Sequence, residues 1–396
     1  MTTLCTVLGL VAIQDMELVQ MDVKIAFLHG DLDETIYMKQ PEGFVNELTK
    51  PTKAELVCKL RKALYGLKQG SRQWYQKFDK LMQSQGYTRS QEDCCLYTRK
   101  ANDSSLIILI LYVDDMLIAG KSIDEINQLK KMLSTQFSMK DLGAANLFLG
   151  MRIKRDKQRG ILELSQEKYI QKFLQRFSMQ GGKSLSTPMQ AYIKLGKEDS
   201  PMTDAEREEM AKVPYSSAVG SLMYAMVATR PDIAYAVGVV SRYMSNLGKK
   251  HWEAVKKILR YLQGTASSCL RFRNSDAFIV GYTDCMSSST TEAEYVAAFD
   301  ASKEAIWLAR LVGDLGIHQV PVLHCDSQIA IALANNPVFH SKSKHIEVRY
   351  HVTRDVLAGK RIELAKVHTD NNPADALTKS LALERFAHCI ELMGVG

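Results

Sequence analysis

Residues Leu106–Gly120 read Leu-Ile-Ile-Leu-Ile-Leu-Tyr-Val-Asp-Asp-Met-Leu-Ile-Ala-Gly, two apolar runs interrupted only by Asp114 and Asp115. Large aliphatic and β-branched residues on both sides of a two-residue break predict a hairpin of buried strands. The usual turn dipeptide is Asn-Gly or Asp-Gly, whereas two adjacent carboxylates repel each other. An exposed acidic turn is the alternative, but the flanking strands favour a metal site, because a cation would offset the repulsion.

The composition is that of a soluble globular protein. The chain has 396 residues, 46% hydrophobic and 24% charged, enough for two or three domains. Its net charge of +7 permits nucleic-acid binding without requiring it. Neither apolar run reaches the ~20 residues of a membrane span. The 8 cysteines form no paired Cys-x-x-Cys motifs, so we expect reduced thiols inside a cell. Leu4–Ile13 is predicted to be a core helix, since no basic residue precedes it as in a signal peptide.

A third aspartate belongs with the hairpin. Leu18–Val23 is predicted to be a strand with Asp22 at its end, where a lone acid would normally be a cap or a surface charge. The segments Asp22-Val23-Lys24-Ile25-Ala26-Phe27 and Tyr112-Val113-Asp114-Asp115 resemble the two aspartate motifs of reverse transcriptases. The resemblance implies that Asp22, Asp114 and Asp115 hold two Mg²⁺ (or Mn²⁺) ions about 3.5–4 Å apart for nucleotidyl transfer to a DNA primer.

The same resemblance extends to nucleotide and template contacts. Phe27 matches the aromatic gate that excludes a 2′-hydroxyl, with an ordinary core phenylalanine as the alternative. Residues 63–74 match a further block of copia-type retrotransposons, although Ser71 replaces the usual proline. A loop with an incidental basic face stays the alternative for this block. The residues to which the family assigns nucleotide or template binding are Phe27, Tyr65, Gly66, Lys68 and Arg72.

Further copia-type matches run through the middle of the chain, in residues 30–44, 215–224 and 229–233. Apolar spacing predicts helices over 126–137, 163–179 and 215–245, separated by a polar linker over 181–209. Residues 147–153 resemble the hairpin that grips the primer end in this family, with a plain core strand as the alternative. Residues 251–262 form an amphipathic helix with one lysine-rich face. Such a face is usually only solvated, and contact with the phosphates of an RNA–DNA hybrid is the functional alternative.

The last part of the chain alternates strands and helices. Strands are predicted over 278–284, 320–325 and 362–368, which favours a parallel α/β unit with acids gathered at one sheet edge. These residues resemble the ribonuclease H domain of copia-type elements. The resemblance implies two further Mg²⁺ ions for hydrolysis of the RNA strand of a hybrid, and it places Lys344–His351 on a basic helix near the phosphates. The implied metal ligands are Asp284, Glu292, Asp326 and Asp375, with Glu294 as an alternative to Glu292.

Two segments expected of the family are short or missing. About twenty residues without Lys or Arg precede Asp22, where the family has a basic fingers segment, so the chain looks shortened at its front. Only Cys285–Thr291 separates Asp284 from Glu292. Two antiparallel strands with their turns need at least ~14 residues and do not fit there. The first strand of this domain is therefore expected to be an exposed sheet edge.

The sequence is thus interpreted as a truncated copia-type retrotransposon Pol polyprotein fragment, with reverse transcriptase and ribonuclease H parts. The predicted fold is an α+β palm over 1–153, a helical connector over 154–274, and an α/β ribonuclease H-like domain lacking two strands over 275–396. The expected partners are an RNA template, a DNA primer, RNA–DNA hybrid and dNTPs, with no membrane. The expected location is intracellular, in cytoplasmic virus-like particles or the nucleus. The alternative function is a catalytically impaired nucleic-acid-binding remnant.

Overall fold

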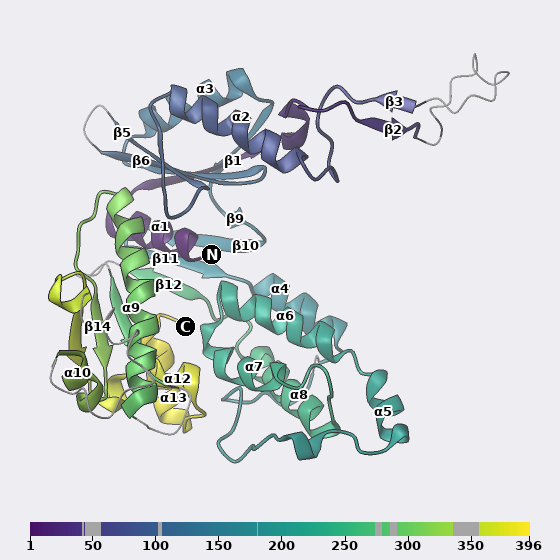
Figure 1. The fold of residues 1–396 in the computed structure, drawn as a ribbon, viewed down its shortest axis with the longest axis vertical. Coiled ribbons are helices and arrows are strands. Elements are labelled where there is room, and N and C mark those ends of the chain that lie inside the picture. The colour runs from purple at the N-terminus through teal and green to yellow at the C-terminus, as the bar shows by residue number, and fades with distance from the viewer. Residues whose placement is uncertain are drawn as a thin grey trace. The chain divides into compact units, whose positions relative to one another are not determined.

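The computed structural model describes residues 1–41, 43, 57–101, 105–179, 181–273, 279–285, 291–335 and 356–396, with the side chains of 291 and 292 left out (Figure 1). The chain is mixed α/β and divides into two compact units, one of Met16–Ala145 and one of Met1–Asp15 with Asn146–Gly396. The predicted helix Lys344–His351 and most of the 42–56 stretch lie outside the described residues. The three predicted functional domains stay a prediction.

The unit of residues 16–145 is built on a six-stranded antiparallel sheet in the order β4-β5-β6-β7-β1-β8. The predicted hairpin is confirmed and lies at its centre. A small second sheet pairs β2 (Tyr37–Lys39) with β3 (Val57–Lys59). The strands of the main sheet are β1 (Glu17–Val23), β4 (Thr88–Arg89), β5 (Leu96–Lys100), β6 (Leu106–Tyr112), β7 (Asp115–Gly120) and β8 (Met139–Ala144).

Two helices, α2 (Gly70–Ser84) and α3 (Ile123–Gln136), cover one face of this sheet (Figure 1). Trp74 and Phe78 of α2 and Leu129 of α3 share a core with alternate residues of β1, β6 and β7. Every second residue of these strands thus packs against the buried side of the two helices, and together they form one layer of side chains. The helix predicted over 126–137 is confirmed, and it begins at the Ser122 cap, whose hydroxyl accepts the Glu125 N–H.

The larger unit contains a four-stranded sheet in the order β12-β11-β10-β9. Its strands are β9 (Leu147–Phe148), β10 (Met151–Asp156), β11 (Ile161–Ser165) and β12 (Leu270–Arg273). The predicted helix near the N-terminus is confirmed as α1 (Thr2–Ile13), and it packs on β11 and β12. The predicted 147–153 hairpin is confirmed too. Its two loop residues, Leu149 and Gly150, both have positive φ (50° and 77°), as a type I′ turn requires.

The helix predicted over 163–179 is partly wrong, because α4 spans only Glu167–Arg176. Residues before it form β11, in which Leu162 and Leu164 are buried on one face. The Ser165 hydroxyl then accepts the Glu167 N–H at 3.2 Å and separates strand from helix. Over so few residues the apolar pattern alone does not distinguish a strand from a helix, and here the run forms a strand.

The following helices are α5 (Asp204–Ala211), α6 (Tyr215–Ala228), α7 (Ala234–Ser241) and α8 (Lys249–Gly264), with short 3-10 turns at 197–199 and 231–233. Of these, α6, α7 and α8 share one hydrophobic core with α4. The polar stretch predicted as a linker is thus partly helical. Two lysines at the start of α8 are paired within the chain, since Lys249 lies 2.9 Å from Glu209 and Lys250 lies 2.6 Å from Asp199. These exposed pairs are individually weak.

The third sheet is parallel, in the order β13-β14-β15 (Val280–Thr283, Val322–Cys325, Glu363–Lys366). This order confirms the predicted parallel α/β unit. Helices α9 (Thr291–Asp314), α10 (Gln328–Asn335), α12 (Asp375–Thr378) and α13 (Leu383–Leu392) accompany it. Within the described residues, β13 has a strand partner on one side only. It is the sheet edge that the short 285–291 connection predicts.

One ion pair is completely buried. Arg230 and Asp232 have 0% exposed side chains, and the guanidinium donates two hydrogen bonds to Thr265 besides those to Asp232. The Tyr261 hydroxyl donates to the same carboxylate at 2.6 Å. Removing one member of such a network leaves an uncompensated charge in the core.

We expect Asp232→Ala to lower the free energy of unfolding by about 3–5 kcal/mol, because Arg230 is left buried without its carboxylate. Urea denaturation followed by circular dichroism measures the change. The matched control is Arg159→Ala, which breaks an exposed 3.7 Å pair with Asp156 and is expected to change stability by less than about 0.5 kcal/mol. Equal losses in the two variants would contradict the role of the buried pair.

The buried His251 ring is expected to make the stability of the fold depend on pH. The buried ring accepts the Gly248 N–H at Nδ1 (2.9 Å), faces the Gly196 carbonyl at Nε2 (3.2 Å) and stacks on Tyr243. Burial lowers the pKa of His251 below its ordinary 6.5, so the unfolded chain takes up a proton at higher pH than the folded chain. The contribution of the neutral ring is complete above about pH 6.5 and is lost as the pH falls through the folded-state pKa.

Between about pH 7.5 and pH 5 we therefore expect the urea midpoint to fall less in His251→Gln than in the parent chain. The glutamine variant should be less stable at the higher pH, because it does not reproduce the stacked ring. An identical fall in both chains would show that other groups carry the acid sensitivity.

Candidate active sites

The three aspartates predicted to act together lie on adjacent strands. β1 pairs with β7 so that Asp22 lies opposite Asp115, and the Val23 N–H donates to the Asp114 carbonyl at 2.8 Å. Strand pairing thus brings together Asp22 and Asp115, which are 93 positions apart in the sequence. All three aspartates are partly exposed, and a ligand can reach them from solvent.

The turn lies one residue earlier than predicted. Tyr112 pairs with Asp115, so the two-residue loop is Val113–Asp114, and Asp115 is already in the strand. Val113 has φ +59°, a left-handed conformation that β-branched residues rarely adopt. The Trp74 indole N–H donates to the Val113 carbonyl at 2.6 Å. This bond from the core of the unit holds the strained tip in place.

Crowding of like charges is the main electrostatic feature of this site. Burial raises the pKa of Asp115, and the neighbouring Asp114 and Asp22 carboxylates raise it further, against a hydrogen bond from Gln20 at 3.4 Å. Bound cations would relieve this repulsion, and carboxylate oxygens are the ligands that Mg²⁺ and Mn²⁺ prefer. The donor set therefore fits divalent cations. Among described side chains, however, these three do not form a group with all ligand atoms within 4.8 Å of one another.

Phe27 and Tyr65 form an aromatic pair beside the aspartates. Their ring centroids lie 4.3 Å apart, and a Cβ on Gly70 would approach Phe27 to 3.8 Å. Partial burial raises the pKa of Tyr65, and the Asp114 and Asp22 carboxylates raise it further. The predicted gate residue thus packs against a second predicted binding residue, near the acids.

Lys68 and Arg72 line a cavity of about 410 Å³ at the start of α2, together with Asp33 and Glu34. The cavity therefore carries charges of both signs. Gly66, in the preceding loop, has φ +95°, which explains why glycine is used there. No described contact joins this cavity to Asp22 or Asp114.

A second group of acids lies at the carboxyl ends of β13 and β14. Asp284, Asp326 and Asp375 have ligand atoms within 4.8 Å of one another, as do Asp284 with Glu294 and Glu294 with Asp326 in overlapping groups. The predicted convergence of Asp284, Asp326 and Asp375 is thus observed. The Glu292 side chain lies outside the described residues, while its predicted alternative Glu294 lies in the cluster.

Hydrogen bonds hold these acids in position. The Asn372 amide donates to the Thr283 carbonyl at 3.1 Å, and its oxygen accepts the N–H of Ala374, the residue before α12, at 3.2 Å. The Thr378 hydroxyl contacts the Asp284 carboxylate. α12, which begins at Asp375, is therefore fastened to the end of β13.

Oxygen, and not sulfur, is the available donor in this cluster. Burial raises the pKa of Cys325 to about 11, so its thiol stays protonated at neutral pH. The Cys285 thiol donates to Glu294 at 3.2 Å. The second Glu294 oxygen is buried and has no described hydrogen-bond partner. Burial and the Asp284 and Asp326 carboxylates raise the pKa of Glu294, and a divalent cation would relieve both effects.

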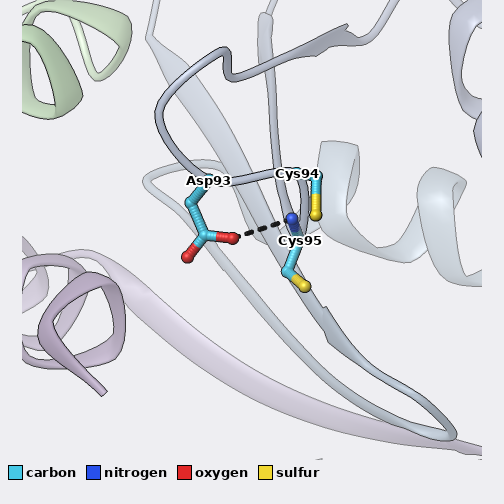
Figure 2. Close-up of side chains that lie close together, drawn as sticks. All are labelled: Asp93, Cys94 and Cys95. Atoms are coloured by element: carbon cyan, nitrogen blue, oxygen red, sulfur yellow. Dashed lines mark hydrogen bonds between the residues drawn. The ribbon is translucent and has the colours of Figure 1, made fainter.

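Asp93, Cys94 and Cys95 form a third cluster of ligand atoms (Figure 2). The Asp93 carboxylate accepts the Cys95 N–H at 2.9 Å, the bond drawn in Figure 2. Burial raises the pKa of Cys95 to about 12, so its thiol is a poor metal ligand. This cluster is a loop closed by an aspartate turn.

Sequence reasoning missed the residues that support the acids, namely Gln20, Trp74, Thr378, Lys379 and Arg385. Trp74 and Gln20 are distant in sequence from the tip that they contact. Lys379 carried a local signal, since it lies four residues after Asp375, the spacing at which a lysine reaches a carboxylate on a helix.

Comparison with known proteins finds relatives along the whole chain. The reverse transcriptase (RNA-dependent DNA polymerase) family matches residues 3–191. A retrovirus-related Pol polyprotein from transposon TNT 1-94 of Nicotiana tabacum is 50% identical over 429 aligned positions, which cover 100% of this chain and 32% of the relative. A transposon Ty5-1 protein of Saccharomyces cerevisiae, YCL074W, is 34% identical over 64% of this chain and 79% of its own length.

The chain spans about a third of the length of its Nicotiana tabacum relative. A foamy viral protease–reverse transcriptase solved with RNA/DNA hybrid aligns with 89% of this chain and 44% of that chain, at 13% identity and a TM-score of 0.48, too low to assign a fold. In the described ranges no helix is long and apolar enough to cross a bilayer. The sequence matches show that the chain belongs to the reverse transcriptase family of copia-type retrotransposon Pol polyproteins.

Proposed function

We propose that this chain is the RNA-directed DNA polymerase part of its polyprotein, acting on an RNA template, a DNA primer and dNTPs. The observation that carries the proposal is the β1–β7 register, which sets Asp22 opposite Asp115 at the hairpin tip. Family membership supports the reaction class, and the geometry supports the choice of residues.

The acids Asp22, Asp114 and Asp115 would hold two Mg²⁺ or Mn²⁺ ions, which supply Lewis-acid activation of the primer 3′-hydroxyl and neutralise charge on the α-phosphate. Gln20 orients the Asp115 carboxylate through its hydrogen bond. Trp74 fixes the loop that bears Asp114. Phe27, backed by Tyr65, presents a flat apolar surface to the sugar of the nucleotide, and Lys68 and Arg72 attract phosphates.

A second activity is proposed for the acid cluster of the larger unit, namely hydrolysis of RNA in RNA–DNA hybrid. The proposal is supported by the closeness of the Asp284, Asp326 and Asp375 ligand atoms. It is also supported by Glu294, which has a buried carboxylate oxygen without a hydrogen-bond partner. Glu294 is therefore preferred over Glu292 as the fourth acid. Cations held there would activate the attacking water.

The alternative function is a catalytically impaired remnant that still binds nucleic acid. The edge position of β13 favours it, because an acid-bearing strand supported on one side is less firmly held. The alignment with the Nicotiana tabacum relative spans 429 positions for a chain of 396 residues, so the relative contains residues that this chain lacks. Activity assays separate the two functions.

Primer extension on an RNA template tests the polymerase. We expect Asp114→Asn to reduce extension with Mg²⁺ or Mn²⁺ by roughly 10²–10³-fold, because the loss of one carboxylate weakens cation binding where charge develops. The matched control is Asp141→Asn on β8, an aspartate of the same sheet paired with Lys130 at 2.5 Å. It should retain extension within about 2-fold.

Equal activity in Asp114→Asn and the parent chain would refute the assignment of the site. No extension by the parent chain, with hybrid binding retained, would establish the remnant function instead.

Cleavage of a labelled RNA–DNA hybrid tests the second site. We expect Glu294→Gln to reduce cleavage by roughly 10²-fold or more, and Glu292→Gln, two residues away on the same helix, to reduce it much less. The reverse order would assign the fourth acid to Glu292. Loss in both variants would indicate that the glutamates act as a pair.

A further inference from the structure

Two of the four acids in the larger unit already have basic partners. The Lys379 ammonium lies 3.3 Å from Asp284 Oδ2 and 3.0 Å from Asp375 Oδ1. The carboxylates of these aspartates are 1% and 0% exposed. Arg385 contacts the other oxygen of Asp375. Two basic side chains of the chain itself therefore lie against the Asp284–Asp375 side of the cluster, where the buried Asp375 Oδ1 has an ion pair but no hydrogen bond.

The other two acids are in a different state. Among the described residues, no lysine or arginine nitrogen lies within 4.0 Å of the Glu294 or Asp326 carboxylate. Glu294 Oε2 is buried without a hydrogen-bond partner. Lys366 approaches only the backbone carbonyl of Asp326. The charge without a basic partner thus lies on the side of the cluster where a Glu294 oxygen and an Asp326 oxygen lie within 4.8 Å of each other.

We infer that Lys379 takes the place of one of the two cations, so that this site binds a single divalent ion on its Glu294–Asp326 side. The inference rests on the proposed ribonuclease H-like function and deepens it. An ammonium is a compact point charge, and between two buried carboxylates it offsets the repulsion that a metal ion would otherwise offset. It supplies no exchangeable water, so only the remaining ion can activate one.

The position of Lys379 suits this role. It is the residue at which α12 ends, with extended backbone (φ −146°, ψ 160°), four residues after Asp375. Because the Thr378 hydroxyl contacts the Asp284 carboxylate, the next residue, Lys379, places its ammonium between Asp284 and Asp375. The side chain is 47% exposed, so the bridge lies at the mouth of the cluster and its removal does not open a cavity in the core.

Counting bound Mn²⁺ by electron paramagnetic resonance tests the inference without an activity readout. All chains carry Asp22→Asn and Asp114→Asn, which suppress binding at the polymerase site. We expect the background chain to bind one ion, Lys379→Met to bind two, and Lys379→Arg to remain at one. Lys303→Met, which removes an exposed lysine of α9, is the matched control and should also remain at one. Asp326→Asn should bind none.

Thermal unfolding shows whether the Lys379→Met chain is folded. Without metal, Lys379→Met should melt several degrees below the background chain, because two buried carboxylates lose their cation, and Mn²⁺ should restore the difference. Two ions bound by the background chain, or one ion still bound by a folded Lys379→Met, would overturn the inference. No ion bound by any chain would instead refute the proposed metal site itself.

Discussion

The antiparallel pairing of β1 with β7 is the constraint on which the first candidate site depends. It connects strands separated by a long stretch of chain, and their register sets Asp22 opposite Asp115. A shift of one residue would turn every side chain of β1 to the opposite face of the sheet. It would expose Val19 and Met21, which are buried against α2 and α3. Burial of the apolar residues of β1 therefore fixes the strand register, and the register fixes the position of Asp22.

Both clusters of acids hold like charges close together, but the chain offsets the repulsion differently. At the hairpin tip the support is neutral, from the Gln20 amide and the Trp74 indole. In the larger unit it is partly cationic, from Lys379 and Arg385. A neutral support leaves the full carboxylate charge for a ligand, whereas a cationic one uses part of that charge. The two sites should therefore differ in how strongly they attract divalent ions.

Local patterns predicted much of the fold. The central hairpin and α1 follow from apolar runs and α3 from apolar spacing, whereas the parallel pairing of β13, β14 and β15 follows from the alternation of strands with helices. The errors arose where a contact distant in sequence decides the outcome. The tip loop begins at Val113 because pairing continues to Asp115 and the Trp74 bond stabilises a strained residue. Ile161–Ser165 is a strand because β10 and β12 lie on either side of it.

The candidate sites followed the same rule. The acids could be named from motif resemblance, whereas the groups that hold them could not, because Gln20, Thr378 and Arg385 act through geometry that spacing does not reveal. For the lysines of α8 the sequence revealed the charge but not the partners. Their pairing with Asp199 and Glu209 depends on how a polar segment folds back.

The placement of α1 has a consequence for biosynthesis. This helix is made early, yet the strands that it covers, β11 and β12, are completed only at Ser165 and Arg273. At roughly 5–20 residues per second, on the order of tens of seconds pass before its apolar side finds its sheet. During that time the unit of residues 16–145 is already fully synthesised. The apolar side of α1 therefore stays uncovered by its own sheet until the chain has been made as far as Arg273.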